Sequence, residues 1–219
     1  MKEIVIFGLG DAGKIAQFYF SRDSDYTVVA FALDDEFFSE PEFVGLPVVR
    51  SSELVDTYPP AKYGMFVAVG YSKMNQVRAE LYEKMKSLGY TLVNYISSRC
   101  TFLTEEKIGD NLFILEDNTI QPFVSLGSNI TMWSGNHIGH DAIIEDNCFI
   151  TSHVVISGHV RVGAGSFIGV NATLRNNITI GEKTLIGAGA IIMKPTKAGA
   201  VFVPERTGVF SKTSDQIDM

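Results

Sequence analysis

The chain has 219 residues, a net charge of −7 and 46% hydrophobic residues, enough for one large domain or two modest ones. The acidic balance and the absence of a basic block argue against nucleic acid as a partner. Two cysteines without metal-type spacing argue against a disulfide scaffold. The N-terminus leads straight into a short apolar run and a glycine loop. We therefore expect neither a signal peptide nor a membrane span, and we expect a cytoplasmic protein.

The first elements in chain order follow the pattern strand, glycine loop, helix, strand. Residues 2–7 are a short apolar run rich in Ile and Val, which predicts a buried parallel strand. The loop of residues 8–13 has the glycine spacing G-x-G-x-x-G, and residues 14–20 look helical. A second apolar run, residues 26–33, ends in two aspartates. This order predicts a Rossmann-like nucleotide-binding α/β unit.

The glycine loop and the acidic pair Asp34-Asp35 carry the binding hypothesis. The glycines permit a close approach of backbone to phosphate, and the helix N-terminus offers N–H groups and partial positive charge. An acid after the second strand can accept hydrogen bonds from a ribose or a base. The alternative is a purely structural turn, because such glycines also close ordinary strand-to-helix connections. A dinucleotide is disfavoured, since the short α/β region leaves little room for a second mononucleotide half.

The remainder of the N-terminal region is expected to complete this α/β unit. Residues 65–69 predict a third strand, and Ser72 is the expected N-cap of a helix over residues 73–88. Residues 91–95 are expected to form one more strand. The apolar stripe of the helix, which we expect to pack in the core, is Val77, Leu81, Met85 and Leu88.

A six-residue repeat dominates the second half of the chain. An aliphatic residue or Met occupies every sixth position from Ile108 to Ile192. This period fits neither a helix nor an alternating strand, and it predicts a parallel β-helix with three hexads per coil. Glycine often follows the aliphatic residue, where a corner needs a residue without Cβ. We expect an α/β domain over residues 1–97 and a β-helix domain over residues 98–219, closely apposed because no Gly/Ser-rich linker separates them.

Histidines supply the candidate chemistry of the β-helix. All four lie within two adjacent coils and outside the inward positions: His137, His140, His153 and His159. His140 followed by Asp141 is the sharpest pair, because a neutral imidazole can take a proton from an attacking amine or hydroxyl and a carboxylate raises its basicity. We predict His140 as a general base, with an exposed turn histidine as the alternative. A substrate contact, a structural role, a role as catalytic base and a solvated position stay open for His137. His153 and His159 are candidates for contacts with ligand or a neighbouring subunit.

These motifs, in this order, resemble the bacterial sugar acyltransferases of the left-handed β-helix class. The chain is most similar to the bacillosamine-pathway nucleotide-sugar N-acetyltransferases and their sialic-acid O-acetyltransferase relatives. The resemblance covers essentially the whole chain, through the glycine loop, Asp34-Asp35, Val69-Gly70 and the hexapeptide array with His140-Asp141. It implies a homotrimer with active sites between neighbouring β-helices. It also implies acetyl-CoA as co-substrate, no required metal and a role in lipopolysaccharide or other surface-glycan biosynthesis.

The resemblance also implies roles for single residues. His140 matches the catalytic base, Asp141 the acid that supports it, and Gly158 the glycine whose N–H faces the acetyl carbonyl as an oxyanion donor. The substrate-binding loop and acidic pair of the family match Gly10, Asp11, Ala12, Gly13, Asp34 and Asp35, with His137 as a further substrate candidate. The coenzyme A groove matches Phe149, Gly158, Val170 and Ala188.

The chain departs from the family in two places. Phe149 stands where relatives often carry a histidine, so one polar contact to the coenzyme is lost. The family tail usually reads Gly-x-Pro-Ala near the adenine, whereas this chain reads Val203-Pro204-Glu205-Arg206. Arg206 could meet a coenzyme phosphate or could simply lie on the surface.

The expected reaction is acetyl transfer from acetyl-CoA to the amino group of a nucleotide-linked amino-deoxy sugar. A sugar hydroxyl as acceptor, giving an O-acetyl ester, is the first alternative. A trimeric metal hydratase on the same scaffold would need a His-x4-His pair, which the spacings of the four histidines lack. A non-catalytic binding trimer and a nicotinamide dehydrogenase, which rests on the glycine loop alone, are the remaining alternatives.

Overall fold

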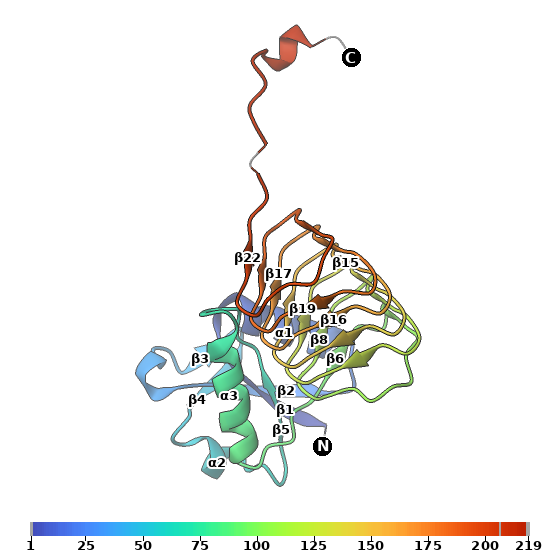
Figure 1. Cartoon of the computed structure of the whole chain (residues 1–219). Coiled ribbons are helices and arrows are strands. Elements are labelled where there is room, and N and C mark those ends of the chain that lie inside the picture. Colours follow the sequence, from blue (N-terminus) through green and yellow to red (C-terminus); the bar gives the residue numbers. More distant parts are fainter. Residues whose placement is uncertain (1, 206, 218–219) are drawn as a thin grey trace.

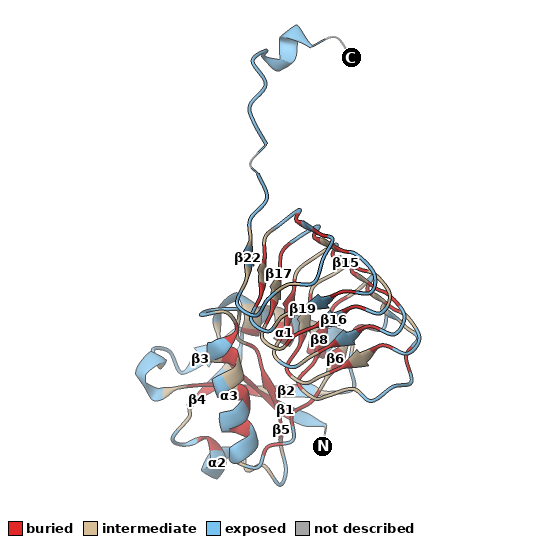
Figure 2. Ribbon diagram, in the orientation of Figure 1, coloured by how far each residue is buried: buried red, intermediate tan, exposed pale blue. Residues whose placement is uncertain are grey.

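The computed structural model describes residues 2–205 and 207–217. An α/β domain lies against the flank of a stack of short coils, and the C-terminal residues extend away from the stack (Figure 1). Buried residues gather inside the coils and along the sheet of the α/β domain (Figure 2). None of the helices in the described part of the chain has the length and apolar character needed to cross a bilayer.

The α/β domain is built on a five-stranded sheet in the order β3-β4-β2-β1-β5, in which only β3 runs antiparallel to its neighbour. The predicted first two strands are confirmed, each within one residue of its expected start, and the predicted third strand ends earlier than expected. The strands are β1 (Glu3–Phe7), β2 (Thr27–Leu33), β3 (Glu42–Phe43), β4 (Leu46–Arg50) and β5 (Gly64–Val67). The helices are α1 (Gly10–Arg22), α2 (Leu54–Thr57) and α3 (Gln76–Ser87), with a 3-10 turn η1 (Asp35–Phe37).

The start of α3 differs from the prediction. Ser72 is not its N-cap, because Asn75 occupies that position with a left-handed backbone (φ 66°) and the helix begins at Gln76. The predicted apolar stripe is only partly correct: Met85 is buried, but Val77, Leu81 and Leu88 are half-buried. The other fully buried positions of α3 are Arg78 and Tyr82. Both reach polar groups of the coils, which explains why a search for apolar periodicity overlooks them.

The coils begin before Ile108. The strand predicted over residues 91–95 is reduced to one bridge between Leu92 and Met65, and β6 (Tyr95–Ile96) pairs instead with a strand eighteen residues further along the chain. Residues Tyr95–Ile96 thus belong to the sheets of the β-helix. The domain boundary between residues 97 and 98 stays a prediction.

The coils form three parallel sheets, which we call the seven-stranded, six-stranded and four-stranded faces. Partner residues are eighteen positions apart, as with Thr131 and Phe149. The seven-stranded face comprises β6 (Tyr95–Ile96), β8 (Phe113–Ile114), β11 (Thr131–Met132), β14 (Phe149–Ile150), β17 (Phe167–Ile168), β20 (Leu185–Ile186) and β22 (Val201–Phe202). The six-stranded face comprises β7 (Thr101–Phe102), β9 (Thr119–Ile120), β12 (His137–Ile138), β15 (Val155–Ile156), β18 (Thr173–Leu174) and β21 (Ile191–Ile192). The four-stranded face comprises β10 (Ser125–Leu126), β13 (Ile143–Ile144), β16 (Arg161–Val162) and β19 (Thr179–Ile180), and a 3-10 turn η2 (Ser214–Gln216) lies in the C-terminal segment.

The interior of the β-helix confirms the six-residue repeat. Every predicted inward aliphatic residue from Ile114 to Ile192 is buried in one core cluster, and Ile108 packs against its end. A second side chain of each hexad, four residues after the aliphatic one, also points inward. Where this residue is polar, it forms hydrogen bonds with backbone carbonyls at the corners of the coils. The Asn118 amide donates to the backbone of Leu115 (2.8 Å) and Trp133 (2.9 Å), as buried polar groups require. The sequence thus specifies both the apolar stack and its polar supports.

The corners of the coils have two steric requirements. A Cβ on Gly139 would lie 2.5 Å from the backbone nitrogen of Gly158 in the next coil, so glycine is needed there for close approach. The second requirement is a left-handed backbone three positions after the inward aliphatic residue of the hexad. The non-glycine residues at this position have φ between 51° and 67°. Asn, Asp and His tolerate that conformation better than most residues. The non-glycine residues that adopt it are Asn111, Asp117, Phe123, Asn129, Asp141, Asn147, His153, His159, Asn171, Asn177 and Lys183.

Polar contacts join the α/β domain to the β-helix, which confirms the predicted close apposition. Arg78 is fully buried and donates to the carbonyls of Asn129, Asn147 (3.0 Å) and Cys148 (3.2 Å), and burial lowers its pKa to about 10. The Asn111 side chain exchanges hydrogen bonds with Val67, accepting at 2.8 Å and donating at 3.2 Å. The edge strand β5 is therefore closed by the backbone of Thr91 and Val93 at Met65 and by Asn111 of the β-helix at Val67.

Candidate active site

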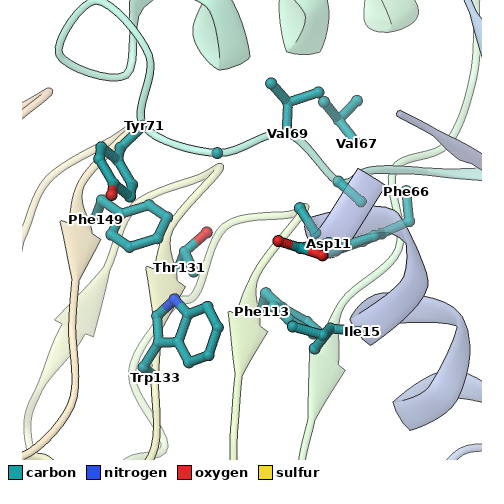
Figure 3. A pocket seen from close by; sticks show the side chains of 13 residues that line it. Asp11, Ile15, Phe66, Val67, Val69, Tyr71, Phe113, Thr131, Trp133 and Phe149 are labelled. Atoms are coloured by element: carbon teal, nitrogen blue, oxygen red, sulfur yellow. The ribbon is translucent and has the colours of Figure 1, made fainter. Parts of the chain in front are cut away.

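A cavity of about 270 Å³ lies where the α/β domain meets the seven-stranded face (Figure 3). We call it the inter-domain cavity. In the sheet, β1 has β2 on one side and β5 on the other, so the crevice at the carboxyl ends of β1 and β5 is the point where ligands bind in open α/β sheets. The cavity occupies that place. Its lining residues are Asp11, Ala12, Ile15, Phe66, Val67, Ala68, Val69, Gly70, Tyr71, Phe113, Thr131, Trp133 and Phe149.

The glycine loop packs tightly beside this cavity. Gly8 has a left-handed backbone (φ 118°), and a Cβ there would lie 2.4 Å from the carbonyl oxygen of Ala68. A Cβ on Gly13 would lie 2.3 Å from the carbonyl oxygen of Gly8. These glycines therefore have a structural purpose in joining β1, α1 and the end of β5. The binding role predicted for Gly10 and Gly13 stays a prediction.

The structure separates the predicted substrate-binding residues into two groups. Asp11 and Ala12 line the inter-domain cavity, whereas Asp34 and Asp35 do not. Asp34 forms an ion pair with Lys84. Asp35 accepts hydrogen bonds from the Ser51 hydroxyl (3.2 Å) and the Ser52 amide (3.1 Å), and hydrogen bonding to Ser52 lowers the pKa of Asp35. The acidic pair thus has partners within its own domain.

His140 and Asp141 meet at the corner between the six-stranded and four-stranded faces. The His140 Nδ1 and the Asp141 Oδ2 are 2.8 Å apart. Neighbouring residues of a strand point to opposite sides, but the left-handed backbone of Asp141 (φ 57°) turns its carboxylate towards the imidazole. The Gln121 side chain fixes the same turn by accepting a hydrogen bond from the His140 amide (2.8 Å). The predicted pairing of the two side chains is therefore present in the structure.

The next coil adds Gly158 and His159 to this corner, and we call the four residues His140, Asp141, Gly158 and His159 the His140 corner. A Cβ on Gly158 would lie 2.7 Å from the His140 Nε2, so glycine leaves room for the imidazole. The Gly158 amide donates to no acceptor within residues 2–205 and 207–217. The His159 ring lies edge-on to His140, with centroids 4.9 Å apart, and its Nε2 is 3.9 Å from the Asp141 Oδ2. An imidazole, a carboxylate and an available N–H thus share one exposed edge.

Two imidazoles and one carboxylate at the His140 corner offer ligand atoms within 4.8 Å of one another. Among the described residues this is the one group with such spacing. The hydratase alternative requires three imidazoles, and the other two histidines lie elsewhere. His137 is half-buried on β12, facing outward, and His153 occupies a different corner, against Gly135.

The residues predicted for coenzyme A are distributed over three places. Phe149 is buried on the seven-stranded face between Tyr71 (ring centroids 5.0 Å apart) and Phe167 (5.7 Å). Val170 and Ala188 are exposed on successive coils at the corner between the seven-stranded and six-stranded faces. Gly158 lies at the His140 corner, which is opposite the seven-stranded face in a three-sided coil. One chain alone therefore does not bring Phe149 together with His140.

Several residues at these sites escape sequence reasoning. Tyr71, Thr131 and Trp133 line the inter-domain cavity, and Gln121 orients the His140 turn. One signal is present in the sequence: the outward positions Phe113, Thr131, Phe149 and Phe167 recur every eighteen residues on one face. Aromatic residues pointing outward indicate that something covers that face. Here the cover is the α/β domain.

Comparison with known proteins agrees with this architecture. The PglD N-terminal domain family matches residues 3–85, and the bacterial transferase hexapeptide family (six repeats) matches residues 159–194. The acetyltransferase domain of PglB from Neisseria gonorrhoeae superposes with a TM-score of 0.80 at 23% identity, covering 92% of this chain and 96% of that chain. WeeI from Acinetobacter baumannii gives a TM-score of 0.77 at 20% identity, covering 92% and 97%. These two likenesses show a shared fold.

PerB from Caulobacter crescentus, solved in complex with CoA and GDP-perosamine, superposes with a TM-score of 0.80 at 25% identity. The match covers 91% of this chain and 92% of that chain. Both family matches fall on the two parts of the chain for which the sequence predicted a nucleotide-binding unit and a hexapeptide array. The N-terminal part of the chain is therefore a PglD-type domain and the C-terminal part carries bacterial transferase hexapeptide repeats, and together they have the two-domain fold of these acetyltransferases.

Proposed function

We propose that the protein transfers the acetyl group of acetyl-CoA to the amino group of a nucleotide-linked amino-deoxy sugar. The observation that carries this proposal is the His140–Asp141 pair at 2.8 Å, with the available Gly158 amide beside it. The likeness to PerB, which was solved with CoA and GDP-perosamine, supports the choice of both substrates. A role in surface-glycan biosynthesis and a cytoplasmic location stay predictions.

The geometry of the corner suits base-assisted acyl transfer. When His140 donates its Nδ1–H to Asp141, its Nε2 is left free to take a proton from the attacking amine. The amine nitrogen forms a bond to the thioester carbonyl carbon, and the Gly158 N–H stabilises the oxyanion that develops. The C–S bond then breaks, and the CoA thiolate takes the proton held by His140. No step of this mechanism requires a metal.

The proposed active site is completed by a second copy of the chain in a homotrimer. The cavity and the coenzyme candidates Phe149, Val170 and Ala188 lie on or beside the seven-stranded face, opposite the His140 corner. Apolar side chains are exposed on both faces that flank this corner, with Ile143 37% and Val155 39% exposed. Such residues favour a protein neighbour over water. The His140 corner of one copy would then face the cavity of the next.

A panel of acceptors tests the reaction itself. UDP-, dTDP- and GDP-linked 4-amino-deoxy sugars, and the same sugars with a hydroxyl group in place of the amine, are each incubated with acetyl-CoA. We expect CoA thiol release with an amino sugar and a base-stable amide product identified by mass spectrometry. A base-labile product from a hydroxyl sugar would instead identify an O-acetyltransferase. Absence of thiol release with every acceptor would contradict the proposal.

A further inference from the structure

The lining of the inter-domain cavity is aromatic and carries a single charge. Five of its thirteen residues are aromatic, and Asp11 is the one charged residue among them. Figure 3 shows the Asp11 carboxylate pointing into the cavity, with Thr131 and Trp133 across from it. A pyrophosphate in this cavity would meet a carboxylate and no cationic side chain. The lining therefore suits a positively charged group, since aromatic faces and carboxylates both attract cations.

Asp11 is placed to act on a ligand rather than on the protein. It lies in the first turn of α1, where the helix dipole stabilises a negative charge. Its carboxylate forms no hydrogen bond or ion pair with any other described residue. Lys14, one turn along the helix, lines a neighbouring groove that Asp11 also borders, but it does not line the cavity. A helix N-terminus that already carries a carboxylate has less attraction for phosphate.

We infer that the inter-domain cavity binds the ammonium group of the acceptor sugar, with Asp11 as its counter-ion and the aromatic rings around it. The inference rests on the proposed function and assigns the residue that selects an amino acceptor over a hydroxyl acceptor. Whole small-molecule ligands occupy pockets of roughly 300–1,000 Å³. At about 270 Å³ the cavity takes the sugar ring and leaves the nucleotide outside.

The ammonium site also fits the proposed reaction. Asp11 holds the acceptor in its charged form until the ammonium releases one proton to solvent, and the His140 of a neighbouring copy then takes the second proton as the neutral amine attacks. An acceptor with a hydroxyl group would leave the Asp11 charge without its counter-ion. Sites built for a particular polar group reject analogues that lack it for this reason.

The only tryptophan of the chain makes this inference directly measurable, because Trp133 lies on the cavity wall. Its fluorescence is titrated with GDP-perosamine and with the GDP-linked sugar that has a hydroxyl group in place of the amine, and with the UDP- and dTDP-linked pairs. Asp11→Asn is compared with wild type and with Asp25→Asn, which makes the same charge change just beyond the other end of α1. Hydrogen bonds to charged groups contribute roughly 1.5–3 kcal/mol, so Kd for an amino sugar should rise about 10- to 100-fold in Asp11→Asn. Binding of the hydroxyl sugar should be weak and indifferent to the variant.

Acetyl transfer measured in parallel separates the two proposals. An Asp11→Asn enzyme that acetylates the amino sugar with wild-type KM would overturn the ammonium site and leave the proposed function standing. Equal Kd values for amino and hydroxyl sugars in wild type would overturn it as well, as would pyrophosphate alone reproducing the change in fluorescence. Asp11-dependent binding of an amino sugar without any acetylation would leave the ammonium site standing and contradict the proposed reaction.

Discussion

The inter-domain cavity and the His140 corner differ in how much of each is built by a single chain. The cavity is walled by both domains, with Phe66 and Phe149 buried in its lining. At the corner the His140 side chain is 54% exposed and that of Asp141 41% exposed. The proposed recognition of the acceptor thus needs only a folded chain, whereas the proposed catalysis needs association of chains.

The largest effect should come from removing the base. His140→Ala is expected to lower kcat by about 10²- to 10⁴-fold, the contribution of a positioned general base. The melting temperature should stay close to wild type, because the side chain is exposed and packs in no core. Steady-state thiol release measures kcat, with His153→Asn at a different corner as the control. Near-normal turnover would remove His140 from the mechanism.

Mixed assemblies test directly whether the two regions act across chains. His140→Ala abolishes the corner, and Ala12→Phe fills the cavity; each variant alone should be almost inactive. If each site combines the corner of one copy with the cavity of the next, every trimer that contains both variants has one intact site of three, so mixed trimers should show about a third of wild-type activity. The measurement is the specific activity of co-expressed, differently tagged chains purified through both tags in turn. No recovery in confirmed mixed assemblies would place both halves of the site in one chain.

Substitutions at two corner glycines distinguish an effect on the position of the His140 ring from an effect on folding. In Gly158→Ala the atoms nearest to the new methyl group are those of the His140 ring, so the imidazole should shift and kcat should fall roughly 10- to 100-fold, as small misplacements do. In Gly139→Ala it meets backbone atoms of the next coil at 2.5 Å, so that variant should lose stability instead. Thermal unfolding and kcat are measured for both. A stable, fully active Gly158→Ala enzyme would show that activity does not depend on the space that Gly158 leaves for the His140 imidazole.

The stability of the contact between the α/β domain and the first coil should depend on pH. Asp23 accepts hydrogen bonds from Tyr95 (2.7 Å), Ser97 (3.0 Å) and the amide of Ser98 (3.0 Å). Burial alone would raise its pKa, but hydrogen bonds led by Ser98 and Tyr95 hold it at about 2. A carboxylate whose pKa is lowered in the folded state stabilises the fold at pH values above its unfolded-state pKa. This contribution to stability is lost as the pH falls from about 4 to 2. Asp23→Asn should therefore melt a few degrees lower at pH 7, and the gap should close at pH 2; a gap independent of pH would contradict this.

The smallest effect should come from His159. Its Nε2 is 3.9 Å from the Asp141 carboxylate, too far for a hydrogen bond, whereas His140 is already bonded. Asn tolerates the left-handed backbone at this position, so His159→Asn should keep the corner intact and change kcat by less than about threefold. Loss comparable to that of His140→Ala would show that the second imidazole takes part in proton transfer.

The β-helix could be predicted closely because each hexad meets the same surroundings, so its sequence pattern repeats with its structure. The start of α3 could not, since three successive left-handed residues, Lys73–Asn75, replace the expected Ser72 cap. The burial of Arg78 was equally hidden, because its partners are carbonyls of coils distant in sequence. Residues that form contacts between domains do not recur with a regular spacing in the sequence of either domain, so a periodic pattern does not reveal them.

The candidate site divides in the same way. The His140–Asp141 contact is local and could be anticipated from adjacency at a corner. The cavity required knowledge of which face of the β-helix the α/β domain covers, and this is why Trp133 and Tyr71 escaped notice. The ion pair of Asp34 with Lys84, on a helix fifty residues further along the chain, was also beyond local reasoning.

The left-handed corner has a consequence for how chemistry can be gained or moved on such a scaffold. The conformation favours short polar side chains, and Asp141 and His159 satisfy the backbone while presenting a carboxylate and an imidazole at the edge. Replacing one tolerated residue by another exchanges an inert amide for a reactive group without rebuilding the coil. Equivalent corner positions in successive coils lie about 4.8 Å apart, so a few substitutions could shift an active centre along the edge by one coil.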